Sequence, residues 1–390
     1  MLFSHKDNEK LALLVNLQSS IIKLSFVVIK PAVAPHIVYT LSKDIHARHY
    51  AESIKFIEAS LGALRGAIET GMRRFKDIAK SDGLEVGIPP IDEVHFVLSS
   101  PWVVSRAKII SLSFVKPTAI TRDLVLNAIK NEREKDFPPD AKISIIEEKI
   151  FDVLLNGYSN TNWERKQTLR ADVSFATTVA GIGMTDRLRG VCEEHGISRS
   201  VAFHSAPLLF FTGMRIVEPE ARDCLLLHVH GELTDIVAVE RGNCALFASY
   251  PLGADSLAHA VAKTAKVSDD TADSTVSLYI GGYLDEKESA ASIHALKQAG
   301  KDWADGVKNT LTRANLSLGD FQSIVVSADK HEDFFETGLA GLLEKNRVHT
   351  VHSLQPEDLT PFVSSGQHAE LAKMMGLYAV AVNNLEYARR

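Results

Sequence analysis

The chain has 390 residues, of which 45% are hydrophobic and 24% charged, a composition typical of globular proteins with more than one domain. Its formal net charge of -6 argues against nucleic-acid binding, which needs a basic patch. The three cysteines show no metal-binding spacing, as expected in a reducing compartment. The N-terminus is polar and no apolar run reaches the ~20 residues of a membrane span. We therefore expect a cytoplasmic protein without a signal peptide or direct membrane insertion.

The first half of the chain opens on a predicted three-strand meander. Its strands are expected over 11–15, 21–29 and 36–41, where Leu, Val and Ile dominate. A helix is predicted over 51–80, because apolar residues recur there every three or four positions. A further strand is predicted over 93–99.

The next stretch, 104–185, predicts a compact insert of β-α-β-β-α order. Its elements are a strand over 107–114, a helix over 121–135, strands over 143–156 and 169–179, and a helix over 185–195. Thr121 is suited to cap the first of these helices, and Gly157 marks a turn. A strand over 199–203 and a helix over 207–215 complete the first half.

The second half, from residue 221, repeats the opening of the first. Strands over 224–229, 235–241 and 244–251 form a second predicted meander, followed by helices over 255–266, 286–315 and 332–345, a buried strand over 323–327 and an apolar helix over 371–385. Because each half begins with three strands followed by helices, the sequence predicts a duplicated α/β fold.

Each meander begins with a strand, a short polar turn and a second strand. A hairpin of this kind cradles phosphates when glycines let backbone N–H groups approach the ligand and an aspartate holds the metal. The first loop, 16–23, contains no glycine, and the second loop, 228–235, contains one, Gly231.

Duplicated halves that each begin with such a hairpin resemble the actin-like ATPase fold, a duplicated ribonuclease H-like fold, and most closely its FtsA and PilM family. The segments that carry the resemblance follow the order of the family: the first loop at 15–23, the strand into the insert at 97–102 with the helix start at 119–123, a turn of the insert at 155–158, the second loop at 228–235 and the turn after it at 250–253.

The resemblance implies three parts. A first lobe (1A) would comprise 1–103, 186–220 and 364–390. An inserted subdomain (1C, SHS2-like) would comprise 104–185, and a second lobe (2A/2B) would comprise 221–363.

The residues that define the nucleotide site of this family are replaced in this chain. Asn16 and His228 stand where the family has the aspartates that act through Mg²⁺, and Gln18 and His230 stand at glycine positions. A histidine is a poor ligand for such a hard cation. The glycines of the adenosine motif, expected at 327–329, are also missing. We therefore expect a pseudoenzyme that has no catalytic residue and does not hydrolyse ATP.

The polar residues that remain leave weak or altered binding of ATP and Mg²⁺ open. The candidate residues of this degenerate cleft are Asn16, Gln18, Ser19, Ser20, Lys23, Gly231, Glu232, Thr234, Asp235 and Ser327. We assign no metal site. Alternation along a strand sends His228 and His230 to one face, where Asp235 or His204 could complete a transition-metal site, but the spacing fixes no third ligand.

The resemblance also implies a function: a cytoplasmic scaffold, peripheral to the inner membrane, in a type IV pilus or related secretion machine. PilM-like proteins bind the cytoplasmic tail of a PilN-like membrane protein in a groove beside the insert. We expect this partner, other pilus assembly proteins and homo-oligomers. One alternative is an FtsA-like cell-division filament protein, although the sequence ends without the amphipathic tail of FtsA. The other is a live actin-like ATPase, against which the lost aspartates argue.

Overall fold

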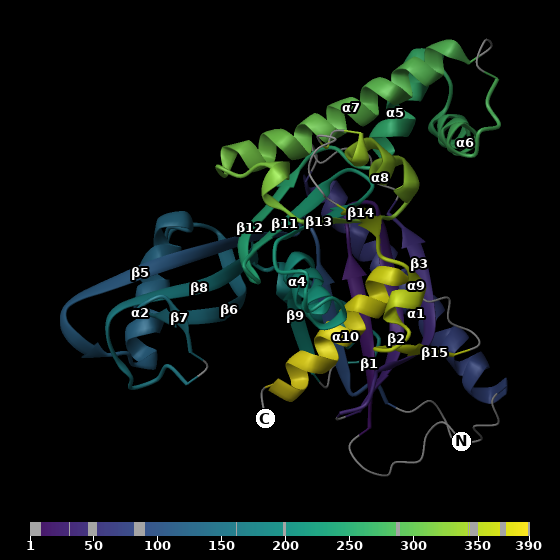
Figure 1. Ribbon diagram of the computed structural model, residues 1–390. Coiled ribbons are helices and arrows are strands. Elements are labelled where there is room, and N and C mark those ends of the chain that lie inside the picture. Colours follow the sequence, from purple (N-terminus) through teal and green to yellow (C-terminus); the bar gives the residue numbers. More distant parts are fainter. Residues whose placement is uncertain are drawn as a thin grey trace.

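Three sheets organise the part of the chain that this computed structural model describes (Figure 1). The described residues are 9–30, 32–45, 53–81, 90–160, 162–197, 200–285, 289–341, 343, 350–366 and 372–388. The predicted helix starts at Ala51, Glu286 and Leu371 lie outside these residues, as do the C-terminal Arg389 and Arg390. Within them, no helix combines the length and the apolar character needed to cross a membrane.

The first sheet has the strand order β15-β3-β2-β1-β4-β9. Its strands are β1 (Lys10–Leu17), β2 (Ile21–Ile29), β3 (His36–Asp44), β4 (Glu93–Leu98), β9 (Val201–Ser205) and the short β15 (Ser364–Ser365). β1, β2 and β3 pair antiparallel, as the predicted meander requires, and β4 and β9 extend the sheet in parallel. β1 is buried on both faces, which explains its continuous apolar sequence.

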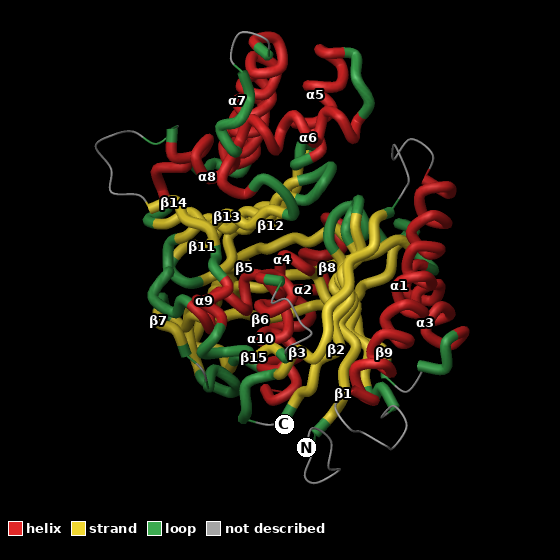
Figure 2. Tube along the Cα trace, turned by 90° about the vertical axis from the view of Figure 1, so that its right-hand side faces the viewer, coloured by secondary structure: helices red, strands yellow, loops and turns green. Residues whose placement is uncertain are grey.

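Helices cover both faces of this sheet (Figure 2). α1 (Ser53–Ser81) and α3 (Met184–Glu194) pack on one face. α4 (Ala206–Val217) and α10 (Lys373–Ala388) pack on the other face. Alternate side chains of β1 contribute to the two cores, so both layers are held by the same strand. We call this sheet with these four helices the first lobe.

The second sheet repeats the design of the first, with the order β12-β11-β10-β13-β14. Its strands are β10 (Cys224–Val229), β11 (Thr234–Glu240), β12 (Asn243–Tyr250), β13 (Ser323–Ala328) and β14 (Thr350–Ser353). β10, β11 and β12 pair antiparallel, and β13 and β14 follow in parallel. The shared strand order and strand directions confirm the predicted duplication.

The second lobe consists of this sheet and the helices on its outer face. These are α5 (Asp255–Ala265), α6 (Asp269–Ile280), α7 (Ala290–Arg313) and α8 (Glu332–Ala340), which share one core with the sheet. The 3₁₀ turn η1 (Leu318–Asp320) and the short α9 (Pro356–Leu359) connect its elements. The inner face of this sheet packs on α4 and α10, so these two helices lie in a core that both lobes share.

The insert forms the third sheet, of order β5-β8-β6-β7, and projects to one side of the two lobes (Figure 1). Its elements are β5 (Val103–Ala119), α2 (Arg122–Asp136), β6 (Ile143–Leu155), β7 (Tyr158–Ser159) and β8 (Gln167–Gly181). Thr121 Oγ1 accepts the N–H of Leu124 at 3.2 Å, which confirms the predicted cap. α2 packs in the core of the insert, whereas the next helix in the predicted order, α3, packs beside α1 on the first sheet.

Candidate functional site

The first and second loops, which join β1 to β2 and β10 to β11, lie against each other. The backbone N–H of Glu232 in the second loop donates to Ser19 Oγ in the first loop at 3.4 Å. The loops approach so closely at Gly231 that an added Cβ would clash with Ser20 Oγ and Asp255 Oδ2. A phosphate between these loops would need backbone donors directed at it, but here a donor of one loop is used by the other.

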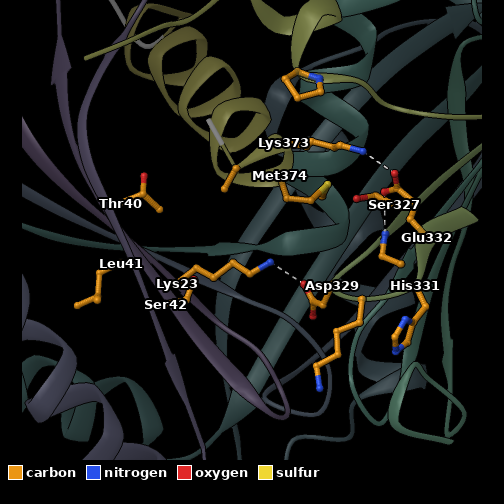
Figure 3. Close-up of a pocket in the computed structure, with 14 residues that line it drawn as sticks. Lys23, Thr40, Leu41, Ser42, Ser327, Asp329, His331, Glu332, Lys373 and Met374 are labelled. Atoms are coloured by element: carbon orange, nitrogen blue, oxygen red, sulfur yellow. Dashed lines mark hydrogen bonds and ion pairs between the residues drawn. The ribbon is translucent and has the colours of Figure 1, made fainter. Parts of the chain in front are cut away.

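A cluster of ionisable side chains is buried at the strand ends next to the loops. Lys23 Nζ lies 2.7 Å from Asp329 Oδ1 (Figure 3), and His230 Nε2 lies 3.0 Å from Asp235 Oδ2. His228 Nε2 and His230 Nδ1 lie 3.8 Å from the two carboxylate oxygens of Asp329. We call Lys23, His228, His230, Asp235 and Asp329 the cleft cluster.

The charges of the cleft cluster balance one another at neutral pH. Burial alone would lower the pKa of His230, but its contacts with Asp235 and Asp329 outweigh burial and raise this pKa to about 9. Burial, assisted by the charge of His230, lowers the pKa of His228 to about 4. The pKa of Asp329 lies well below its usual range, because Lys23 and both histidines outweigh the effect of burial. The cluster therefore presents no excess of positive charge to a phosphate.

The end of β4 holds both loops in place. Three contacts do so: Trp102 Nε1 donates to Gln18 O at 2.8 Å, Ser99 Oγ donates to Asn16 Oδ1 at 3.4 Å, and the N–H of Ser100 donates to Asp235 Oδ2 at 3.5 Å. Trp102 is buried, so its indole N–H needs such a partner. The turn that leads into the insert thus reaches the loops of both lobes.

The cavity beside the two loops is acidic. It has a volume of ≈ 440 Å³. The carboxylates of Glu232, Asp255, Asp269, Asp270 and Asp273 line it, with Lys330 and His259 as the basic residues. Burial raises the pKa of Asp255, and the nearby Lys330 offsets only part of this shift. A triphosphate entering this cavity would meet like charge, which disfavours its binding.

A second cavity, of ≈ 620 Å³, opens beside Lys23 and Asp329. Figure 3 shows that two of its lysines point to acidic partners: Lys23 to Asp329, and Lys373 to Glu332. These cations are already paired in the structure, so a ligand phosphate would have to compete with partly buried carboxylates for them.

The predicted site residues divide between this cleft and the interior of the second lobe. Lys23 and Asp235 belong to the cleft cluster, and Ser327 is buried on β13 opposite His228. Thr234 is engaged elsewhere: its hydroxyl donates to Leu252 O at 2.7 Å and accepts from Trp303 Nε1 at 2.9 Å.

The central role of Asp329 was not predicted from sequence. The sequence placed this residue in the missing adenosine motif, but not among the site residues. Its position follows from the parallel pairing of β10 with β13, which sets Ser327 opposite His228 and brings the next residues to the same sheet edge. The local sequence does not show this pairing. Tyr378 on α10, whose hydroxyl lies 3.5 Å from His228 Nδ1, had no signal in the local sequence.

No protein-family model and no curated protein matches the sequence. Among solved structures, the chain is similar to a chain of the PilM-PilN type IV pilus biogenesis complex, with a TM-score of 0.61 and 15% identity over 97% of this chain and 98% of that chain. Weaker similarities are to the ethanolamine utilization protein EutJ from Carboxydothermus hydrogenoformans (TM-score 0.45, 12% identity, 97% and 92% covered) and to a Bacteroides thetaiotaomicron protein with an actin-like ATPase fold (0.40, 10%, 95% and 95%). The chain has the actin-like ATPase fold, and the predicted likeness to PilM is confirmed at the level of the fold.

Proposed function

We propose that the chain is a non-hydrolysing scaffold that binds the cytoplasmic tail of a PilN-like membrane protein. It would act in the cytoplasm, peripheral to the inner membrane, in a type IV pilus or related secretion machine. The observation that carries the loss of hydrolysis is the direct contact between the two loops. The assembly role is supported by the similarity to a chain of the PilM-PilN complex.

We also propose the division into a first lobe (1–103, 186–220, 364–390), an insert (104–185) and a second lobe (221–363).

The chemistry of ATP hydrolysis has no support in this cleft. A hard divalent cation needs carboxylate oxygens, but Asn16 carries no charge, and Oδ2 of Asp235 is already engaged by His230 and Ser100, which leaves only its Oδ1 without a hydrogen bond. The adjoining cavity adds further negative charge. Gln18 and the serines of the first loop therefore act in our proposal as contacts between the lobes, and Asn16 holds the loop to Ser99.

The free edge of β5 is a suitable place for an extended peptide. β5 is 17 residues long and pairs with β8 on one side. Its first residues, 103–106, lie against 247–249 of the second lobe. Beyond that contact, Ile109 and Val115 are exposed (62% and 106%). An exposed apolar edge strand of this length favours the addition of another strand.

The test is a binding titration with the full chain. A fluorescent peptide that contains the cytoplasmic tail of a PilN-like protein from the same organism is titrated with the chain, and its anisotropy is measured. We expect saturable binding, and we expect Ile109→Lys to weaken it by about tenfold or more, because a buried charge opposes apolar contact.

Ile54→Lys is the matched control, because Ile54 is also well exposed (74%) but lies on α1. This variant should bind as the unchanged chain does. Absence of binding by the unchanged chain would contradict the scaffold proposal. Equal binding by the two variants would place the peptide elsewhere than on β5.

A further inference from the structure

Three buried polar atoms without hydrogen-bond partners converge at the centre of the cleft cluster. Within the described part of the chain, His228 Nε2, His230 Nδ1 and Asp329 Oδ2 are each enclosed and make no hydrogen bond. The three side chains place potential ligand atoms within 4.8 Å of one another. A buried polar atom without a partner is costly and rare, so three such atoms around one point indicate a place for an ion.

The spacing of these atoms suits a metal ion better than direct contact. Each imidazole nitrogen lies 3.8 Å from an oxygen of Asp329, which is too long for a hydrogen bond. Two ligands of one tetrahedral ion with bonds of 2.0–2.2 Å are separated by about 3.3 Å. A small inward movement of the side chains would therefore give ligand geometry. Two imidazoles and one carboxylate select zinc and related transition metals.

The other nitrogen of each histidine is already occupied. His230 Nε2 lies 3.0 Å from Asp235 Oδ2, and His228 Nδ1 lies 3.5 Å from the hydroxyl of Tyr378. Metal-binding histidines are oriented in this way, because a carboxylate or another polar group on the far nitrogen turns the lone pair of the near one toward the ion. These contacts direct His228 Nε2 and His230 Nδ1 to the same point. A bound ion would replace the proton that the raised pKa of His230 leaves on Nδ1 in the metal-free chain.

A fourth ligand is available from the first loop. Lys23 occupies Oδ1 of Asp329, which leaves Oδ2 for an ion. Gln18 Oε1 is also buried without a hydrogen-bond partner among the described residues, and its amide nitrogen lies 3.4 Å from Asp329 Oδ1. Rotation of this amide by half a turn exchanges the two atoms, which brings the oxygen toward the site.

We propose that His228, His230 and Asp329 bind one zinc-class divalent ion, with Gln18 as the fourth ligand. The three principal ligands belong to the second lobe and Gln18 to the first, so the ion joins the two lobes at the place where the fold elsewhere holds a nucleotide. The site has a structural role. It does not depend on the proposed partner, because its ligands all come from this chain.

The test is a metal titration of the full chain after removal of metals with a chelator. Cobalt serves as the spectroscopic probe, and zinc is then added as the competitor. We expect about one equivalent of cobalt with the strong visible absorption of a tetrahedral nitrogen–oxygen site, displaced by zinc, and a melting temperature that rises with zinc concentration. His228→Gln and Asp329→Asn should weaken cobalt binding about 100-fold or more, and Asp235→Asn, which removes charge beside His230, about 10- to 100-fold.

The chain contains a matched control for the loss of a buried histidine. His95 and His204 form another buried pair, in which His95 Nδ1 and His204 Nε2 are hydrogen-bonded at 3.1 Å. His95→Gln should therefore retain cobalt binding. Uptake below about one tenth of an equivalent by the unchanged chain would overturn the proposal, as would equal cobalt affinity of His228→Gln and His95→Gln. Circular dichroism checks the fold of each variant. If His228→Gln does not fold, the cobalt affinity of the isosteric Asp329→Asn is compared with that of His95→Gln instead.

Discussion

The charged residues of the cleft are stable only in combination. His230 is buried between the carboxylates of Asp235 and Asp329. Asp329 also accepts a hydrogen bond from the ammonium group of Lys23. Each of these charges would be costly alone, because an unpaired buried charge is unstable. Together they form a neutral cluster, in which Lys23 of the first lobe pairs with Asp329 of the second.

The ion pair of Lys23 and Asp329 gives the first prediction at this scale. Both side chains are largely buried (15% and 8% exposed). Lys23→Met should lower the free energy of unfolding by about 3 kcal/mol, the low end of the range for breaking a buried pair, because His230 remains beside Asp329. Urea unfolding in the presence of a chelator measures this change without a contribution from bound metal.

Lys43→Met is the control, because Lys43 is exposed on the neighbouring β3. Its effect should lie within about 0.5 kcal/mol of zero. A similarly small effect of Lys23→Met would contradict the view that this pair holds the lobes together.

The secondary-structure elements show which features a sequence can predict. The strands of both meanders and α1 were predicted, because their burial gives them a clear apolar pattern. α6 (Asp269–Ile280) was missed, since Ala272 and Val276 are its buried residues and its other apolar residues are confined to the last turn. β14 has four residues, which are too few to show the apolar–polar alternation of a strand. The packing of α3 against α1 depends on residues more than one hundred positions apart, so a local pattern could not show it.

The same limit applies to the candidate site. The sequence identified Asn16, Gln18, His228 and His230 as departures from a phosphate loop, because each is judged against its own hairpin. It placed Asp235 of the same hairpin near the two histidines, as the structure does for His230. It did not predict the contacts between the hairpins, which are about 200 positions apart and meet only when the sheets pack. Contact between the loops is thus a tertiary property.

The crossing of α4 and α10 gives a prediction at the scale of elements. A Cβ on Gly213 in α4 would lie 2.6 Å from Cγ of Leu377 and 3.0 Å from its carbonyl oxygen in α10. Gly213→Ala should therefore destabilise the chain by about 1–3 kcal/mol through overpacking. Thermal and urea unfolding measure the change.

Gly190→Ala provides the matched substitution in another helix. Gly190 lies in α3, where an added Cβ meets nothing within 4 Å. This change should stabilise the chain by about 0.4–1 kcal/mol, because alanine restricts the unfolded chain. If both substitutions changed the free energy of unfolding in the same direction, this would contradict a close crossing of α4 and α10.

In the whole molecule, contacts within the chain join the lobes without a nucleotide. The core around α4 and α10 belongs to both sheets, the two loops share a hydrogen bond, and Lys23 of the first lobe pairs with Asp329 of the second. A ligand shifts a conformational equilibrium only by its differential affinity for the two states. A chain that is already closed by its own contacts gains little from a nucleotide, which agrees with a scaffold that keeps one shape.

The prediction for the whole molecule concerns Mg-ATP. A site with a Kd of about 10 µM would stabilise the folded chain by about 2.7 kcal/mol at about 1 mM ligand, and the melting temperature would rise. We expect no rise beyond that of a control with Mg²⁺ and sulfate at equal ionic strength.

A triple variant, Asp269→Asn, Asp270→Asn and Asp273→Asn, separates the two reasons for weak binding, charge repulsion and loop contact. It removes negative charge from the acidic cavity but keeps the loop contact. We expect no shift in this variant either, since the two loops lie against each other and the N–H of Glu232 already donates to Ser19. A shift in the variant would make repulsion the main barrier, and a shift in the unchanged chain would restore the live ATPase as the better explanation.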